Sequence, residues 1–178
     1  MKMQSFLYNE KERRLLYKRA VVLTILLLAQ ILIITMFSSQ PSGKSSEISR
    51  SVMNKMEWVP DSIPRETIPG DSRISLHQIV RKLAHFYNFF VVGFLLMGIH
   101  ITLKESSKKA VLLLGLGCLL AIFDEAHQYF VPGRSAEIGD VLIDITGVLF
   151  GMSFIKVFLE IIFAKRWKNV RQEEQKNR

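Results

Sequence analysis

The residues best suited to acid–base or ligand chemistry are one histidine and two aspartates set among apolar residues, His85, Asp124 and Asp144. An imidazole next to a carboxylate can act as a general base, because the carboxylate orients the ring and stabilises its protonated form. An ionised group in apolar surroundings is costly unless it is paired, so such groups commonly mark a site. We therefore predict these three residues as catalytic groups.

Each of the three residues belongs to a polar stripe with helical spacing. His77, Arg81, His85 and Asn88 follow one another at intervals of four, four and three, which places them on one helix face. Similar intervals connect Asp124 with Gln128, and Asp140 with Asp144. The charged and amide residues predicted to bind a ligand are Arg81, Lys82, Glu125, Gln128, Arg134 and Asp140.

Small residues continue two of these stripes. Gly117 and Ala121 precede Asp124, and Gly147 and Gly151 follow Asp144, all at intervals of three or four. Small side chains let membrane helices approach closely, and the Gly-x-x-x-Gly spacing is typical of such contacts. These four small residues are predicted to pack helices together.

The elements that carry the stripes are apolar enough to cross a membrane. The chain has 178 residues, of which 49% are hydrophobic and 22% charged, and the two kinds are segregated along it. Four apolar runs cover residues 20–37, 86–103, 110–130 and 138–163, and about 20 residues suffice to span a bilayer. The sequence predicts an all-α membrane protein with four transmembrane helices. The first run resembles a secretory signal, but the absence of an A-x-A-like cleavage site favours an uncleaved helix.

The loops set the predicted orientation. The connections 104–109 and 131–137 are short, so successive helices must alternate in direction. Lys and Arg are concentrated in residues 1–19, 104–109 and 165–178, which the positive-inside rule assigns to the cytoplasm.

The resulting organisation has three parts in a multi-pass protein of the cytoplasmic membrane. They are a cytoplasmic basic N-terminus (1–19), a four-helix domain (20–163) and a cytoplasmic basic tail (164–178). An extracytoplasmic loop (39–80) joins helices one and two, with a short amphipathic helix expected around Ile48, Val52 and Met56. Ser75 and Ser135 are predicted to cap the second and fourth helices.

With this topology, all three stripes fall at the outer end of the bundle. At 1.5 Å per residue, Asp124 and Asp144 both lie about 9 Å below the outer membrane boundary. Arg81, Lys82 and Arg134 are the available countercharges. The sequence therefore predicts a charged pocket that opens to the outer face.

Several classes of protein and site are disfavoured. The net charge of +8 comes from basic residues that flank apolar runs instead of lining one polar face, so no nucleic-acid partner is expected. Cys118 is the single cysteine, which excludes an intrachain disulfide and a cysteine metal cluster. The zinc motif H-E-x-x-H is absent from the sequence. We expect no metal or other cofactor.

Two segments resemble a known family. RKLAHFYNFF (81–90) and DEAHQYFVPGRSAEIGDVLIDITGVLFG (124–151) closely resemble the VanZ-like family of small bacterial membrane proteins, and the resemblance covers roughly residues 20–155. The founding member is associated with resistance to the glycopeptide teicoplanin. The resemblance implies a role in the cell envelope and supplies no reaction. The positions that match the family pattern are Arg81, Lys82, His85, Asp124, Glu125, Gln128, Arg134, Asp140, Asp144 and Gly147.

The leading hypothesis is a site that binds or modifies an envelope lipid or a lipid-linked wall intermediate at the outer leaflet. The basic residues would hold its phosphate or carboxylate, and His85 with an aspartate would move a proton. The sequence alone does not separate a catalytic pocket from a binding one.

Three alternatives remain open. The charges can form a closed network that only fixes helix packing, with function residing in protein partners. The His, Asp and Glu residues can serve a metal-dependent hydrolase. A transporter is the last alternative, although four helices without a repeat make a thin bundle for alternating access.

Overall fold

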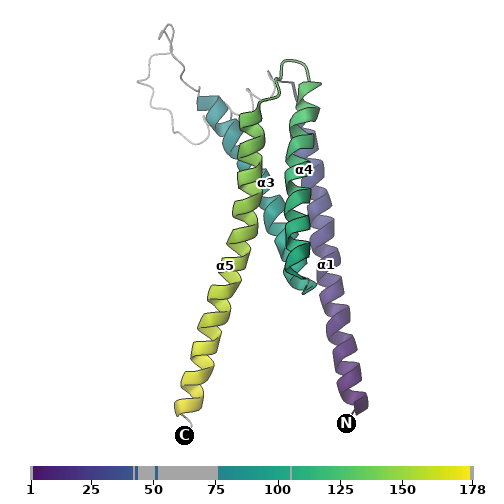
Figure 1. Ribbon diagram of the computed structural model, residues 1–178, viewed down its shortest axis with the longest axis vertical. Helices are drawn as coiled ribbons and strands as arrows, with labels where there is room; N and C mark the ends of the chain where they lie inside the picture. Colours follow the sequence, from purple (N-terminus) through teal and green to yellow (C-terminus); the bar gives the residue numbers. More distant parts are fainter. Residues whose placement is uncertain (1, 42, 44–50, 52–75, 105, 177–178) are drawn as a thin grey trace.

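The structure is a computed structural model that describes residues 2–41, 43, 51, 76–104 and 106–176. In the described residues it contains four helices and no strand: α1 (Lys2–Ser38), α3 (Leu76–Thr102), α4 (Ser107–Tyr129) and α5 (Ile138–Lys176). Figure 1 shows the helices running roughly side by side, with both ends of the chain at the same end of the bundle. The predicted all-α class and the four helices long and apolar enough to span a membrane are confirmed.

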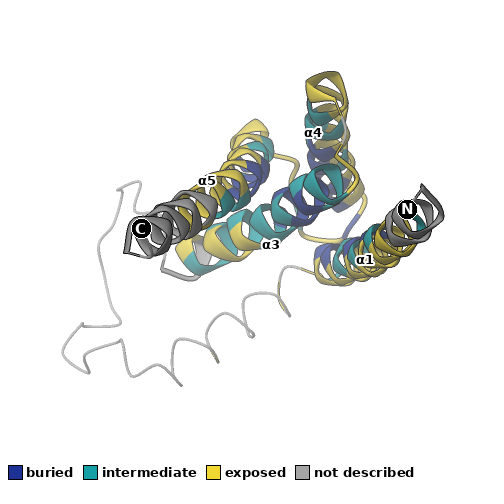
Figure 2. Cartoon of the chain, turned by 90° about the horizontal axis from the view of Figure 1, so that it is seen from below, coloured by how far each residue is buried: buried dark blue, intermediate teal, exposed yellow. Residues whose placement is uncertain are grey.

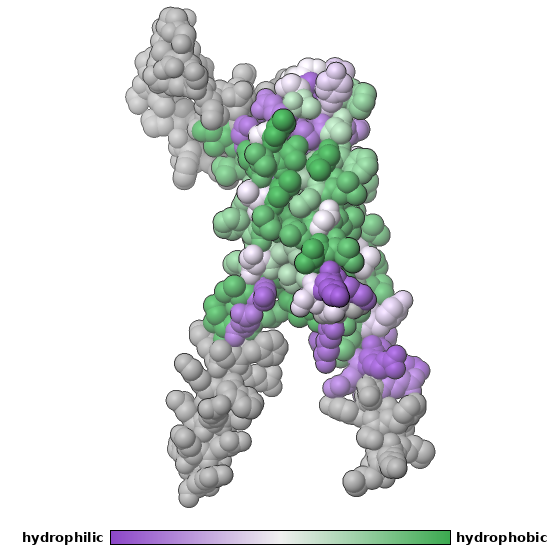
Figure 3. All heavy atoms as spheres, in the orientation of Figure 1, coloured by the Kyte–Doolittle hydropathy of each residue, from purple (hydrophilic) through white to green (hydrophobic). Residues whose placement is uncertain are grey.

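Each helix contains a segment that is long and apolar enough to cross a membrane. These segments are Glu10–Ser38, Ile79–Thr102, Ser107–Tyr129 and Ile138–Ile162. Large apolar side chains point away from the bundle, and Figure 3 shows them as a hydrophobic band between two polar ends. Contiguous exposed apolar surface of this kind suits lipid and not water. The chain is a multi-pass membrane protein.

Helix α3 is the centre of the bundle. It packs most extensively against α5, and also contacts α1 and α4, so that seen along the bundle it lies among the other three (Figure 2). Its residues Phe89, Val92 and Leu96 are almost fully buried and form the core with Ala121 and Val148. This position lets side chains on α3 reach all three neighbours.

Glycines allow α3 and α5 to touch backbone to backbone. A Cβ atom at Gly147 would lie 2.5 Å from the carbonyl oxygen of Phe86, and one at Gly93 would lie 2.1 Å from that of Val148. No side chain fits at such distances, so only glycine permits this approach. The close contact holds the polar ends of α3 and α5 together.

The connection between α4 and α5 is a tight turn. Gly133 has a φ of 75°, in the left-handed region that glycine adopts without strain. Helix α5 begins at Ile138, and the Glu137 carbonyl accepts the first helical hydrogen bond, from the amide of Asp140 at 2.9 Å. The prediction that Ser135 caps this helix is wrong. A residue of another helix stabilises the start of α5, because the Glu125 side chain on α4 accepts a hydrogen bond from the Glu137 amide.

Several predictions fall on residues that the structure does not describe. The amphipathic helix expected around Ile48, Val52 and Met56 lies outside the described residues, as do Ser75, most of the 39–80 loop and the side chain of His77. Helix α3 begins at Leu76, directly after the predicted cap.

Candidate functional site

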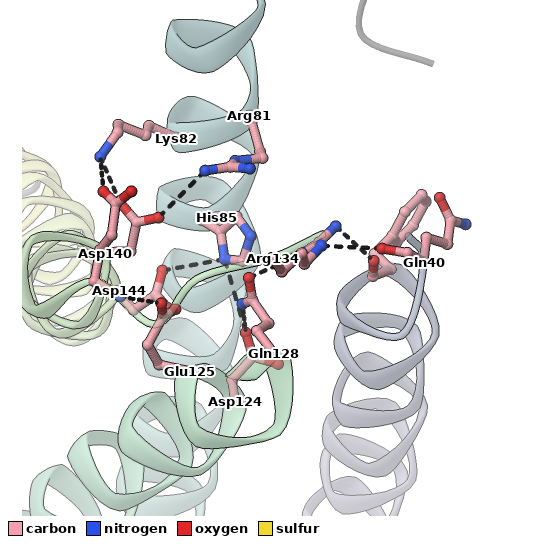
Figure 4. Close-up of polar contacts among 12 residues, drawn as sticks. Gln40, Arg81, Lys82, His85, Asp124, Glu125, Gln128, Arg134, Asp140 and Asp144 are labelled. Atoms are coloured by element: carbon pink, nitrogen blue, oxygen red, sulfur yellow. Dashed lines mark hydrogen bonds and ion pairs between the residues drawn. The ribbon is translucent and has the colours of Figure 1, made fainter. Parts of the chain in front are cut away.

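The predicted catalytic and ligand-binding residues meet at one end of the bundle, where residues 130–137 connect α4 to α5. We call this the α4–α5 end. Side chains from α3, α4, α5 and the connection point toward one another there (Figure 4). The cluster, called the polar cluster below, consists of Arg81, Lys82, His85, Asp124, Glu125, Gln128, Arg134, Glu137, Asp140 and Asp144.

The outer layer of the polar cluster joins α3 to α5 through ion pairs. Lys82 Nζ lies 2.5 Å from Asp140 Oδ1 and 3.6 Å from Glu137 Oε2. Arg81 Nη2 lies 3.7 Å from Asp140 Oδ2. Asp140 is only 4% exposed, so its two contacts are largely shielded from solvent, whereas the Glu137 side chain is exposed. Both basic residues of α3 are therefore engaged with carboxylates of the chain.

One helical turn deeper lies the group of His85, Asp124 and Asp144. His85 Nδ1 is 3.8 Å from Asp124 Oδ2 and 3.6 Å from Asp144 Oδ1. The three side chains come from α3, α4 and α5, and both carboxylates approach the same ring nitrogen of His85 (Figure 4). Asp144 is 0% exposed, and neither of its carboxylate oxygens has a hydrogen-bond partner among the described residues. We call these residues the triad.

A hydrogen-bonded chain orients Asp124 and connects it to α1. Gln128 Nε2 donates to Asp124 Oδ2 at 2.9 Å, and Arg134 Nη1 donates to Gln128 Oε1 at 2.7 Å. Arg134 also donates through Nε to the carbonyl of Gln40 at 2.9 Å, and through Nη2 to that of Phe37 at 3.2 Å. Burial lowers the pKa of the Arg134 guanidinium, which nevertheless stays charged at neutral pH. Arg134 thus uses its planar fork to fasten the connection to the end of α1.

Glu125, a residue of α4, contacts the start of α5. Its Oε1 accepts a hydrogen bond from the Glu137 amide at 2.6 Å, and the side chain is almost fully buried. A carboxylate is favourable at a helix N-terminus, because the unpaired amides there carry partial positive charge. Glu125 therefore ties α4 to the first turn of α5.

The predicted packing residues lie below the triad. Gly117 and Ala121 on α4 face Val148 on α5: a Cβ at Gly117 would meet Val148 Cγ1 at 2.7 Å, and Ala121 is fully buried in the same core. Gly147 and Gly151 face the backbone of α3. All four small residues lie at helix contacts.

An apolar cavity of about 240 Å³ adjoins the triad. It lies among α1, α3 and α4, and one wall is formed by Asp124 itself. The lining residues are Ile31, Ile34, Thr35, Phe89, Leu120, Phe123, Asp124 and His127. A larger open cleft of about 800 Å³ lies at the opposite end, against Arg13, Arg14 and Thr102, far along the helices from the triad. Of these two, the smaller cavity shares a residue, Asp124, with the triad.

Sequence reasoning missed Glu137, Gly93 and the backbone acceptors of Arg134. Glu137 lies one turn before Asp140 and two turns before Asp144, and its spacing of three from Asp140 was a usable signal. Gly93 lies alone in an apolar run, without a partner at interval four. The carbonyl groups of Phe37 and Gln40 carry no signal, because every residue has one.

The geometry permits two kinds of chemistry. An imidazole whose Nδ1 faces two carboxylates can accept and release a proton. The ligand atoms of His85, Asp124 and Asp144 also lie within 4.8 Å of one another, which is close enough to share a cation.

Comparison with known proteins adds a family. No curated protein and no solved structure matches the chain. The VanZ/LLP1 family matches residues 21–159, a range that contains the second and third spans, most of the first and fourth, and the whole polar cluster. On this match, the protein belongs to the VanZ/LLP1 family.

Proposed function

We propose that this protein binds an envelope lipid or a lipid-linked wall intermediate, with part of the lipid chain in the apolar cavity and the headgroup at the polar cluster. The observation that carries the proposal is the double role of Asp124. Its side chain forms a wall of the cavity and also belongs to the triad. An amphiphile whose apolar part enters the cavity would therefore meet the polar cluster at its other end.

The cavity has the chemistry of a chain-binding site. Its walls are mostly aliphatic and aromatic side chains from three helices, with polar atoms from Thr35, Asp124 and His127. Phe123, on its rim, is largely exposed on the lipid-facing surface. An acyl or isoprenoid segment would enter from the bilayer without crossing water, and a volume of about 240 Å³ suits part of such a chain.

Arg81 is the residue we assign to an anionic headgroup. Its Nη2 lies at 3.7 Å from Asp140, beyond hydrogen-bond distance, and its Nε is buried without a hydrogen-bond partner in the described part of the chain. A guanidinium with free donors suits a phosphate or carboxylate. Lys82 lies beside it, and His85 would act as the base if the bound lipid is modified.

The distribution of basic residues supports an outer-leaflet site in the cytoplasmic membrane. Residues 1–19, 104–109 and 165–178 hold most of the Lys and Arg, and their described parts lie away from the α4–α5 end. The positive-inside rule assigns them to the cytoplasm, with both termini. The polar cluster then faces the outer leaflet, as a role linked to glycopeptide resistance requires.

The test compares two bulky substitutions on α4. Leu120→Trp fills the cavity, whereas Leu119→Trp adds the same ring at a neighbouring exposed position outside it. Native mass spectrometry of the full-length protein in mixed bacterial-lipid nanodiscs measures retained lipid. We expect about tenfold less retained lipid for Leu120→Trp, equivalent to about 1.4 kcal/mol, and wild-type retention for Leu119→Trp. Equal retention in both variants contradicts the proposal.

A second candidate function is structural, because the ion pairs are largely satisfied within the chain. Lys82 pairs with Asp140, and the Arg134 side chain bonds three chain groups. If the network only fixes helix packing, the exchange Lys82→Asp with Asp140→Lys restores both folding and teicoplanin resistance. If a ligand is bound, the exchange restores folding and leaves resistance lost.

A further inference from the structure

We propose that His85, Asp124 and Asp144 form a binding site for one divalent transition-metal ion, of the kind that accepts mixed nitrogen and oxygen ligands, such as Zn²⁺ or Mn²⁺. This proposal goes beyond lipid binding and does not depend on it. It also revises the expectation from the sequence that the protein has no metal cofactor.

Two of the three separations in the triad are close to those between the ligands of one metal ion. The ligand atoms come from three different helices and all lie within 4.8 Å of one another, with two of the separations at 3.6 and 3.8 Å. In a tetrahedral site with bonds of 2.0–2.1 Å, the ligand atoms are about 3.4 Å apart. A contraction of a few tenths of an ångström at these two separations brings His85 to that spacing.

Asp144 is the residue that most requires a cation. It is fully buried, and both carboxylate oxygens lack a hydrogen-bond partner in the described part of the chain. One of these oxygens faces His85 within the triad. Buried carboxylates are almost always hydrogen-bonded, ion-paired or metal-bound. A metal ion between Asp144 and His85 supplies the missing partner.

No Lys or Arg side chain of the polar cluster pairs with Asp144 in the described part of the chain. Lys82 and Arg81 pair with Asp140 in the outer layer, and the Arg134 donors go to Gln128 and to two backbone carbonyls. The cluster holds five carboxylates against three basic side chains. The carboxylates are Asp124, Glu125, Glu137, Asp140 and Asp144, and the basic side chains are Arg81, Lys82 and Arg134. With every carboxylate ionised and His85 neutral, as metal binding requires, the excess of two negative charges equals the charge of one divalent cation.

Neighbouring side chains hold Asp124 in place, as they do for carboxylates that bind metal ions. Gln128 donates to the same Asp124 oxygen that faces His85, and Arg134 in turn fixes Gln128. Such outer contacts hold ligating carboxylates in place. One imidazole with two carboxylates favours Zn²⁺ or Mn²⁺ over Mg²⁺ and Ca²⁺, which prefer all-oxygen sites. Three protein ligands leave a coordination position for water or a headgroup oxygen.

The experiment is a metal titration of the full-length protein, purified in detergent with a tag that contains no histidine and stripped with a chelator. Mn²⁺ binding is followed by the loss of the free-ion electron paramagnetic resonance signal, and Zn²⁺ by elemental analysis after gel filtration. We expect about one ion per chain, and at least tenfold weaker binding of Mg²⁺. Pulsed measurements on bound Mn²⁺ should show coupling to a single imidazole nitrogen.

Matched variants identify the site. Asp144→Asn and His85→Gln should weaken binding at least tenfold, whereas Glu160→Gln on α5 and His100→Gln on α3 should bind as the wild type does. Absence of stoichiometric binding to the wild type overturns the proposal, and this result does not depend on whether any variant folds. Equal losses in the triad variants and in the two controls overturn it as well.

Discussion

Gly151 on α5 lies so close to the carbonyl group of Phe90 on α3 that a Cβ atom at this glycine would sit 2.0 Å from the carbonyl oxygen. The obstacle is backbone and not the end of a flexible side chain, so neither residue can move without separating the helices. The same two helices carry Lys82, His85, Asp140 and Asp144. The geometry of the polar cluster therefore depends on a packing contact one to two helical turns from the triad.

Gly151→Ala is expected to lower the free energy of unfolding by about 1–3 kcal/mol, the usual cost of overpacking a tight contact. The measurement is titration with a denaturing detergent, followed by circular dichroism. Gly115→Ala on α4 is the control, because the added methyl group would have no atom within 4 Å apart from its chain neighbours and its own helix backbone. That variant should be unchanged or up to about 1 kcal/mol more stable, since alanine favours helix. An equal response of the two variants would show that the α3–α5 contact is looser than described.

Lys82 and Asp140 should show a measurable coupling energy. Their Nζ and Oδ1 atoms are 2.5 Å apart, with side-chain exposures of 28% and 6%. A double-mutant cycle with Lys82→Met and Asp140→Asn should give a coupling of about 1.5–3 kcal/mol in unfolding free energy, as for hydrogen bonds to charged groups. The pair Arg14 and Glu10, which is exposed on α1, should give a coupling near zero in the same cycle. Additive effects of the two substitutions would contradict the ion pair between Lys82 and Asp140.

The number and type of the helices followed from the sequence for a physical reason. The cost of placing polar backbone and side chains in hydrocarbon acts on each segment by itself, so hydropathy along the chain is sufficient. Hydropathy detects only the part of a helix that lies in hydrocarbon, so the lengths of the helices were underestimated. Helix α1 begins at Lys2 and α5 ends at Lys176, well beyond the apolar runs 20–37 and 138–163.

The membership of the polar cluster was readable from helical spacing, whereas its pairing was not. Spacing places Arg81 and His85 on one face of α3, but the rotation of α5 decides that Arg81 meets Asp140 while His85 meets Asp144. The start of α5 depended on Glu125, a residue on another helix. Contacts of this kind are set by tertiary packing and leave little trace in local sequence.

Gln30 and Asn88 form a hydrogen bond between α1 and α3 inside the apolar part of the bundle. Gln30 Nε2 donates to Asn88 Oδ1 at 3.0 Å and lies 3.3 Å from the Asn88 carbonyl. Interhelical bonds in membranes contribute about 0.6 kcal/mol on average and up to about 1.7. Gln30→Leu should lower the free energy of unfolding by about 0.6–1.7 kcal/mol when Asn88 is present, and by less in an Asn88→Leu background. Thr24→Val is the control, since the Thr24 hydroxyl bonds only the carbonyl of Ala20 on its own helix.

Arg134 should be replaceable by lysine only with loss of the contact between the α4–α5 connection and α1. The guanidinium donates in three directions, to Gln128 and to the carbonyls of Gln40 and Phe37. A lysine ammonium has the charge without the planar fork, so it cannot reproduce this arrangement. Hydrogen–deuterium exchange of backbone amides around 37–41 and 128–134 is expected to rise in Arg134→Lys and to rise further in Arg134→Ala. The matched control is Arg14→Lys, an exposed arginine on α1 whose replacement should leave exchange in both segments unchanged. Wild-type exchange in Arg134→Ala would mean that the connection is held to α1 by other contacts.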